Sequence, residues 1–205
     1  MSSKVYVDRV GHDELYRSSS SALFDADSKK SFCRIFESQN IAPFYKGGGT
    51  KGYVRGTALR GLLRELGGGG RSGGVPVILD AGCGQGELSV YLALRGYRVI
   101  GVDVSAVAVE QARELAAKFG VTDTCQFLEQ SLGALTLRDE AIDGVIGFAS
   151  LHHFIKYPEV AAELHRVVRR DGVGFFADSF GENPVYRLFH DREAMSRLGD
   201  VVLTK

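Results

Sequence analysis

The sequence predicts an α/β protein with a doubly wound, mostly parallel sheet, and two observations lead to this fold class. From residue 75 onward, short apolar runs alternate with segments of helical periodicity. The runs are apolar on both faces, which is typical of parallel strands covered by helices on both sides. Right-handed crossovers between such strands then give a doubly wound sheet.

The predicted elements follow one another in a regular order. Pro158 stands near the start of the last helix, where a missing N–H group is tolerated. The expected strands are residues 75–80, 98–103, 125–129, 143–149 and 173–178. The expected helices between them are residues 87–95, 106–119 and 159–170.

The residues before this pattern differ in composition. Residues 31–38 place Phe32, Ile35 and Phe36 at helical spacing. Residues 56–66 predict an amphipathic helix, after a Gly run at 47–49 that breaks whatever precedes it. A Gly/Ser run at 67–74 is typical of a linker. We therefore expect an N-terminal helical lid with its linker over residues 1–74, and the α/β domain over residues 75–205.

Composition narrows the function classes. The 25 basic and 25 acidic side chains balance, whereas proteins that neutralise nucleic-acid phosphates usually have a basic excess. Residues 1–74 alone hold 12 Lys/Arg against 7 Asp/Glu, which indicates a solvated surface or a basic lid facing an acidic substrate. The three cysteines have no metal-ligand spacing, so we expect no metal. No membrane-spanning or signal segment is recognisable, which predicts a cytoplasmic protein.

The glycine-rich turn after the first strand is the main candidate site. The run Asp80-Ala81-Gly82-Cys83-Gly84-Gln85-Gly86-Glu87 precedes a helix. Ligands of such sheets bind beyond the carboxyl ends of the strands. Glycines let the backbone approach a ligand closely. The third glycine of a dinucleotide fingerprint would fall at Glu87, whose carboxylate would repel a pyrophosphate.

Asp103 ends the second strand, 103 − 80 = 23 residues after Asp80. A carboxylate at this place can accept two hydrogen bonds from ribose hydroxyl groups and would repel a 2′-phosphate. Both positions favour a cofactor that has a ribose but no pyrophosphate. S-adenosylmethionine is such a cofactor.

The segment VILDAGCGQGELSVYLALRGYRVIGVDVS closely resembles the first two motifs of class I S-adenosylmethionine-dependent methyltransferases. The later segments LTLRDEAIDGVIGFASLHHF and LHRVVRRDGVGFFAD resemble the family's fourth strand and the helix, turn and fifth strand that follow. The resemblance covers roughly residues 75–185 and is closest to the small-molecule branch. It implies methyl transfer to an O or N atom of a small-molecule acceptor. From the balanced charge and the lack of a long apolar segment we expect no nucleic-acid or membrane partner.

The resemblance also implies roles for single residues. The acid at Asp80 orients the loop, the glycines contact the methionine portion, and Asp103 holds the ribose. Ser131 and Leu132 should border the adenine, and Phe148 the methionine end. Cys83 fits as a small residue of the turn. The full set expected to bind the cofactor is Asp80, Gly82, Cys83, Gly84, Gly86, Asp103, Val104, Ser131, Leu132 and Phe148.

Three departures from the family pattern stand out. Ser131 occupies a position beside the adenine that is usually acidic. The tight turn before strand five, usually Pro with two Gly, is Arg170-Asp171-Gly172. Residues 179–205 allow a helix over 185–198 and one strand over 200–204, so we expect the C-terminal strands to be incomplete. An unpaired fifth strand would fray, which predicts weak activity.

Two groups of side chains have two interpretations each. His152 and His153 follow strand four, and His153 is a candidate base for a hydroxyl or amine nucleophile. The more common role for such a residue is structural: one of the two histidines packs under the loop and shapes the pocket. Tyr16, Phe44 and Tyr45 could form an aromatic lid over the cofactor or the ordinary core of a helical cap.

Two other functions compete with methyl transfer. A nucleotide-dependent oxidoreductase is disfavoured by the spacing of the glycines. A non-catalytic or truncated methyltransferase-like cofactor-binding module is supported by the short C-terminal part. The cysteine nucleophile of cytosine-5 methyltransferases is missing. The Asn/Asp-Pro-Pro-aromatic segment of amino-directed nucleic-acid methyltransferases is also missing. Asn183-Pro184 does not replace it, because this pair follows strand five and not strand four.

Overall fold

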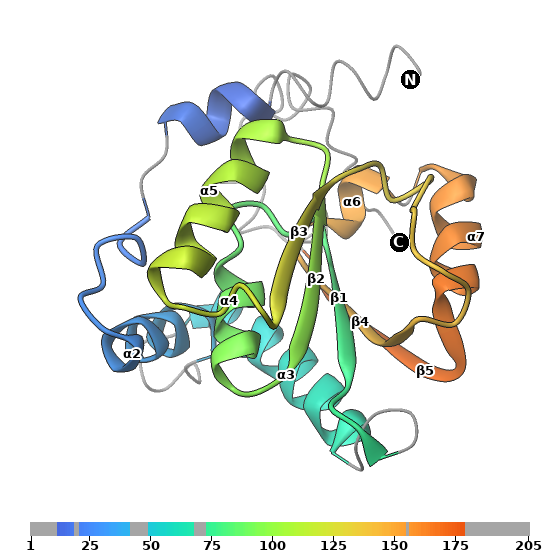
Figure 1. Cartoon of the computed structure of the whole chain (residues 1–205), viewed down its shortest axis with the longest axis horizontal. Coiled ribbons are helices and arrows are strands. Elements are labelled where there is room, and N and C mark those ends of the chain that lie inside the picture. The colour runs from blue at the N-terminus through green and yellow to red at the C-terminus, as the bar shows by residue number, and fades with distance from the viewer. Residues whose placement is uncertain (1–11, 19–20, 42–48, 68–72, 155, 179–205) are drawn as a thin grey trace.

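The computed structural model describes residues 12–18, 21–41, 49–67, 73–154 and 156–178. Its centre is a five-stranded parallel sheet in the order β3-β2-β1-β4-β5 (Figure 1). The strands are β1 (Val77–Ala81), β2 (Arg98–Asp103), β3 (Cys125–Glu129), β4 (Ile142–Phe148) and β5 (Val168–Ala177). The strand order reverses between β1 and β4, which confirms the predicted doubly wound α/β fold.

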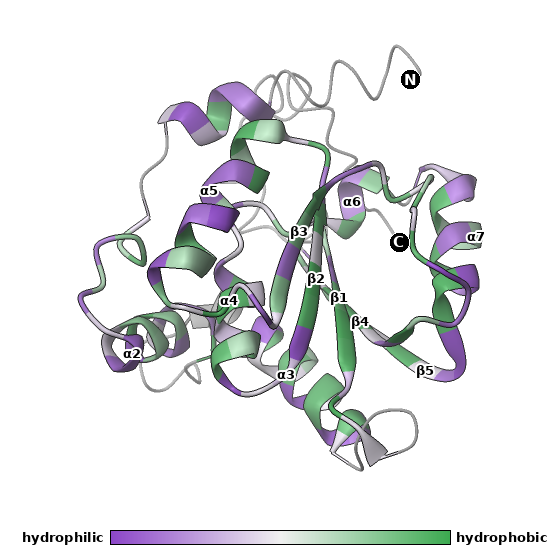
Figure 2. Cartoon of the chain, viewed as in Figure 1, coloured by the Kyte–Doolittle hydropathy of each residue, from purple (hydrophilic) through white to green (hydrophobic). Residues whose placement is uncertain are grey.

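Helices cover both faces of this sheet (Figure 1). The helices are α2 (Lys29–Asn40), α3 (Gly49–Leu66), α4 (Glu87–Leu94), α5 (Ala106–Lys118), α6 (Leu151–Phe154) and α7 (Pro158–Val167). A core that includes Ile78 and Ile146 lies under α2 to α5, and a second core around Leu79 and Val145 lies under α6 and α7. Figure 2 shows hydrophobic residues along the central strands, where β1 and β4 are almost wholly buried.

Local chemistry explains where helices begin. The Ser28 hydroxyl accepts a hydrogen bond from the Ser31 N–H and so caps α2. Ser105 caps α5 in the same way through the Ala108 N–H. Pro158 is in the first turn of α7, as the sequence predicted. No described helix is both long enough and apolar enough to cross a membrane.

The N-terminal helices share the core of the sheet. Phe32 and Phe36 of α2 pack in the same cluster as Leu59 and Leu62 of α3 and the inward face of the strands. Helix α3 is longer than predicted and starts at Gly49. A Cβ built at Gly61 would lie 2.5 Å from the Phe175 ring, so the glycine lets α3 approach β5 closely.

The predicted boundary between the last helix and the fifth strand was wrong. The helix expected over 159–170 ends at Val167, and β5 begins at Val168 rather than at 173. The expected turn at 170–172 is an irregularity inside the strand, because Ile142 pairs with Val168 but Gly144 already pairs with Val173. A Cβ at Gly172 would lie 2.4 Å from the Val168 side chain, so this bulge depends on the glycine.

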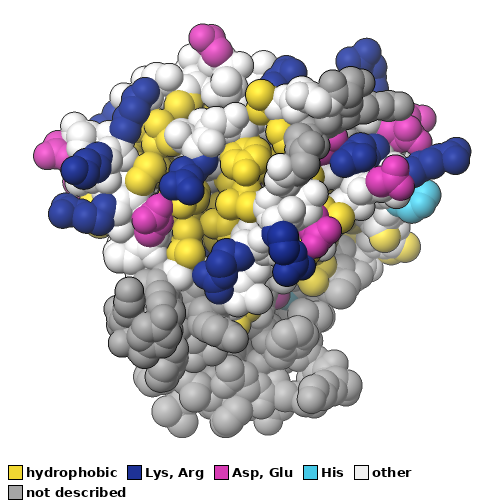
Figure 3. Space-filling view, turned by 90° about the horizontal axis from the view of Figure 1, so that it is seen from below, with side chains coloured by type: hydrophobic (Ala, Val, Ile, Leu, Met, Phe, Trp, Pro, Cys, Tyr) yellow, Lys and Arg dark blue, Asp and Glu magenta, His cyan; other side chains and the backbone are white. Residues whose placement is uncertain are grey.

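Most of the basic residues whose side chains the structure describes in the N-terminal part lie on the surface. Arg34, Arg60 and Arg64 are exposed. Figure 3 views the end of the molecule opposite the predicted site, and there Lys and Arg side chains surround a group of hydrophobic ones. Phe44, Tyr45 and the segment 179–205 lie outside the described residues, and so do the expected helix and strand near the C-terminus.

Candidate functional site

The glycine turn takes a backbone conformation that other residues rarely adopt. It leaves β1 at Ala81 and enters α4 at Glu87. Gly82, Gly84 and Gly86 have φ of 75°, 51° and 78°, in the left-handed region. The turn therefore requires glycine at all three positions.

The three glycines make room for different neighbours. A Cβ at Gly82 would lie 2.6 Å from the Ser150 Cβ, and one at Gly84 would lie 2.7 Å from the Tyr16 hydroxyl oxygen. A Cβ at Gly86 would instead meet Ala112 and Phe127, inside the core. Gly82 and Gly84 thus lie at the site, whereas Gly86 allows close packing of the helices on the sheet.

Asp103 is tied to this turn. Its Oδ2 accepts a hydrogen bond from the Gly84 N–H (2.9 Å), and its Oδ1 accepts one from the Ser105 N–H (2.9 Å). A carboxylate oxygen has two lone pairs, so each keeps capacity for a ligand donor. The ends of β1 and β2 therefore meet as the sequence predicted.

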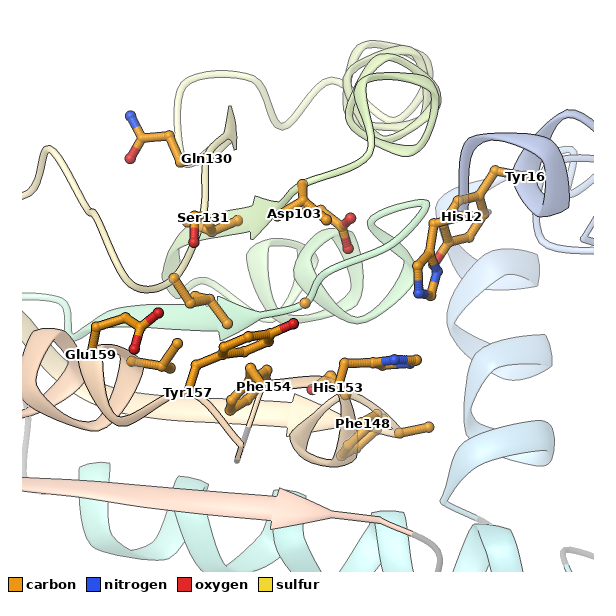
Figure 4. A pocket seen from close by; sticks show the side chains of 17 residues that line it. His12, Tyr16, Asp103, Gln130, Ser131, Phe148, His153, Phe154, Tyr157 and Glu159 are labelled. Atoms are coloured by element: carbon orange, nitrogen blue, oxygen red, sulfur yellow. The ribbon is translucent and has the colours of Figure 1, made fainter. Parts of the chain in front are cut away.

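A first cavity opens beyond the carboxyl ends of β1 to β4 and encloses about 840 Å³, part of it open to solvent. Figure 4 shows Asp103 over its middle, Ser131 and Glu159 toward one end, and His12 and Tyr16 at the other. The predicted residues that line it are Gly82, Asp103, Val104, Ser131, Leu132, Phe148 and His153.

A second cavity lies on the other side of the turn and meets the first. Tyr16, Gly82 and Phe148 line both cavities. Asp80, Cys83 and Gly84 line the second, together with Arg55, Asn40 and Glu87. The tertiary structure thus brings all the predicted cofactor residues except Gly86 to two adjoining cavities.

Burial shapes the electrostatics of Asp80. Its side chain is 1% exposed and accepts a hydrogen bond from the Ser89 hydroxyl (2.7 Å). Removal from water, with a smaller contribution from the charge of Asp103, raises the pKa of the Asp80 carboxyl to about 7, although the hydrogen bonds from Ser89 oppose the rise. Burial also raises the pKa of the Cys83 thiol, so this cysteine stays protonated.

The raised pKa predicts a pH-dependent stability difference between the unsubstituted protein and Asp80→Asn. Between the unfolded pKa of 3.8 and the folded pKa of about 7, the unfolded chain has released this proton while the folded chain keeps it. The unfolding free energy of the unsubstituted protein should therefore fall, relative to Asp80→Asn, by about 1.4 kcal/mol per pH unit in that window. Urea unfolding at pH 5, 6 and 7 measures this; parallel pH profiles would contradict it.

The helical residues 12–18 cover the junction of the cavities. The Asp13 carboxylate accepts hydrogen bonds from the Ser105 hydroxyl and the Val107 N–H. The Gln111 side chain donates to the Tyr16 carbonyl oxygen (3.2 Å). Burial, and after it Asp103, raises the pKa of the Tyr16 phenol, so Tyr16 stays neutral.

Arg55 is a site residue that sequence reasoning missed. It extends from α3 into the second cavity, its Nη1 donates to the Asn40 Oδ1 (2.5 Å), and its guanidinium carbon lies 5.2 Å from the centre of the Phe148 ring. Burial lowers its pKa to about 10, against the opposing charges of Glu87 and Asp178. One signal was available: residue 55 falls on the stripe of 59, 62 and 66, an arginine on an apolar helix face.

The two adjacent histidines have separate surroundings. The His152 Nδ1 lies 2.5 Å from the Asp178 Oδ1, and both side chains are buried. His153 lines the first cavity, with its ring centre 4.1 Å from that of His152 and 4.7 Å from that of His12. His152 therefore packs beneath the loop, and His153 faces the first cavity. No group of three metal ligands gathers among the described residues.

Comparisons with known proteins match the α/β part of this chain. A family model described as a methyltransferase domain matches residues 79–176, which include the glycine turn, Asp103 and most of β5. The tRNA 5-carboxymethoxyuridine methyltransferase of Escherichia coli (strain K12) is 32% identical over 47% of this chain and 37% of its own length. The S-adenosyl-L-methionine-dependent Diels-Alderase iccD of Talaromyces variabilis is 35% identical over 46% of this chain and 33% of its own length.

A solved structure is similar to this chain over a larger share of its length. The PH0226 protein from Pyrococcus horikoshii OT3 is 25% identical, with a TM-score of 0.53, and the match covers 80% of this chain and 68% of that one. The curated relatives are matched over a smaller share, and this chain spans 33–42% of their length.

Proposed function

Because residues 79–176 form a domain of the class I S-adenosylmethionine-dependent methyltransferase family, we propose that this protein transfers the methyl group of S-adenosylmethionine to an oxygen or nitrogen atom of a small-molecule acceptor. S-adenosylmethionine is the cofactor of this family. The site residues and the acceptor class are our proposal, and the arrangement of charges around the turn supports them.

The observation that carries the proposal is the contrast between the two cavities that meet at Gly82. Asp103 faces the first and can accept hydrogen bonds from ribose hydroxyl groups. Arg55 and Glu87 line the second with opposite charges, a pattern that suits the zwitterion of an amino acid, and the buried Asp80 carboxyl lies beside them. A nucleoside joined to an amino acid would span both cavities across the glycine backbone.

The remaining roles follow from position. Val104, Ser131 and Leu132 border the space beyond Asp103, where the adenine would lie. Phe148, under the Arg55 guanidinium, borders the methionine portion. Cys83 contributes backbone and a neutral side chain to the second cavity.

The bound cofactor supplies a methyl group that is already electrophilic, so the protein's main task is alignment. Tyr16 and its helix cover the junction and exclude water. His153 faces the acceptor space and takes the proton of a hydroxyl or amine nucleophile. Asp178 holds His152, whose ring supports that of His153.

Asp103 gives a direct test of the cofactor assignment. Asp103→Ala should weaken the binding of S-adenosylhomocysteine by about 1.5–3 kcal/mol, the range of hydrogen bonds to a charged group. Titration calorimetry measures this. The matched control is Asp123→Ala, which removes the same charge from an exposed position outside both cavities.

Asp103 also accepts the Gly84 N–H, so part of the loss could pass through the turn. An analogue without the two ribose hydroxyl groups separates the effects. The unsubstituted protein and Asp103→Ala should bind it with similar affinity if the hydroxyl groups are the partners. Unchanged affinity of Asp103→Ala for S-adenosylhomocysteine would rule out the ribose role.

The function itself is tested in two steps. S-adenosylmethionine should bind at equilibrium and NAD should not. Formation of S-adenosylhomocysteine is then followed against a panel of phenols, alcohols and amines, with a tRNA pool added because one relative is named for tRNA methylation. A second candidate, cofactor binding without methyl transfer, is favoured by the relative named as a Diels-Alderase. Binding without turnover on any acceptor would support that candidate.

A further inference from the structure

At the end of the first cavity beyond Asp103, the side chains of Ser131 and Gln130 already have hydrogen-bond partners. The Ser131 hydroxyl oxygen accepts a hydrogen bond from the Gly133 N–H (3.2 Å). The Gln130 side chain is bonded at both atoms, accepting from the Thr136 N–H and donating to the Thr136 hydroxyl. In Figure 4 Gln130 points away from the cavity.

One carboxylate at this end has no polar partner among the residues that the structure describes. Glu159 lines the cavity with Ser131 and Leu132, and Figure 4 shows its carboxylate on their side, far from His12. Its side chain fits because position 133 is glycine: a Cβ there would lie 2.6 Å from the Glu159 Cγ. Within the described part of the chain, no hydrogen bond or ion pair involves the Glu159 carboxylate.

We propose that Glu159 recognises the amino group of the adenine, the role that a carboxylate at Ser131 would otherwise fill. This inference rests on the proposed function, since the bound ribose at Asp103 directs the base toward Leu132. The exocyclic amino group offers two N–H donors, and an ionised carboxylate only accepts. Glu159 lies in the first turn of α7, where the helix N-terminus favours a negative charge.

A carboxylate at this place would affect which base is bound as well as how tightly the adenine is bound. A base that carries a carbonyl oxygen at this position would face the carboxylate with an acceptor, and the two would repel. Glu159 therefore selects adenine over hypoxanthine. Because Glu159 is exposed, water competes for its carboxylate, and the preference should be near the lower end of that for charged hydrogen bonds.

The test compares two ligands on the full chain by calorimetry: S-adenosylhomocysteine and its analogue with hydrogen in place of the 6-amino group. The unsubstituted protein should prefer the amino ligand by about tenfold, the ratio that corresponds to 1.4 kcal/mol. Glu159→Ala should reduce this ratio to about one. Glu159→Gln, which keeps an acceptor oxygen, should retain part of the preference.

Two further variants make the result specific. Glu114→Ala removes the same charge from an exposed position on α5 and should keep the full preference. Ser131→Asp in the Glu159→Ala background should restore it, because the new carboxylate stands at the same end of the cavity. A full preference in Glu159→Ala would overturn the inference. Failure of the unsubstituted protein to bind either ligand would instead overturn the proposed function.

Discussion

Gly84→Val is expected to abolish measurable binding of S-adenosylhomocysteine while the α/β fold persists. Valine is disfavoured at the φ of 51° that Gly84 adopts, and its Cβ would lie 2.7 Å from the Tyr16 hydroxyl oxygen. The added atoms also occupy the second cavity, over the backbone that the methionine portion should contact. Affinity should fall by at least about 100-fold, since several contacts of about 1 kcal/mol each are lost together.

A matched variant separates exclusion of the ligand from backbone strain. Gly120 has a similar φ of 61°, and among the described residues the atom nearest to a Cβ there would be the Lys29 Nζ, at 4.0 Å. Gly120→Val therefore introduces comparable strain outside both cavities and should leave cofactor binding unchanged. Far-ultraviolet circular dichroism checks the fold of both proteins. Normal binding by a folded Gly84→Val would show that the cofactor lies elsewhere.

His153→Ala should lower kcat for methyl transfer to a hydroxyl acceptor by at least about 100-fold, the usual contribution of a positioned general base. Cofactor affinity should change little, because His153 lines the first cavity from α6 and is not part of the glycine turn. The measurement is S-adenosylhomocysteine formation under saturating cofactor, beside a binding titration.

The acceptor itself provides the sharpest control. A phenol made acidic by electron-withdrawing groups is already ionised and needs no base, so His153→Ala should lose much less activity on it. His165→Ala removes an exposed histidine of α7 and should behave as the unsubstituted protein does. An equal loss on acidic and ordinary phenols would assign His153 to shaping the pocket.

The sequence by itself determined the elements whose signals are local. The strands β2 and β3 have the predicted bounds, and α4 and α5 each end one residue early. Alternating apolar runs and helical periodicity indicate which face of each segment is buried. The glycines of the turn indicate positive φ angles, which few other residues adopt. The sequence also predicted that Asp103 lies close to Gly84, because the carboxyl ends of parallel strands meet at one edge of the sheet.

Only the tertiary structure decided which distant side chains share the site. Arg55 reaches the second cavity because α3 packs on β4 and β5, and Glu159 faces Ser131 because α7 returns beside the loop after β3. The start of β5 at Val168 likewise depends on pairing with Ile142, against a local pattern that continues the helix. Such contacts join segments far apart in the chain, and their geometry is set by how helices dock on the sheet, which no local pattern records.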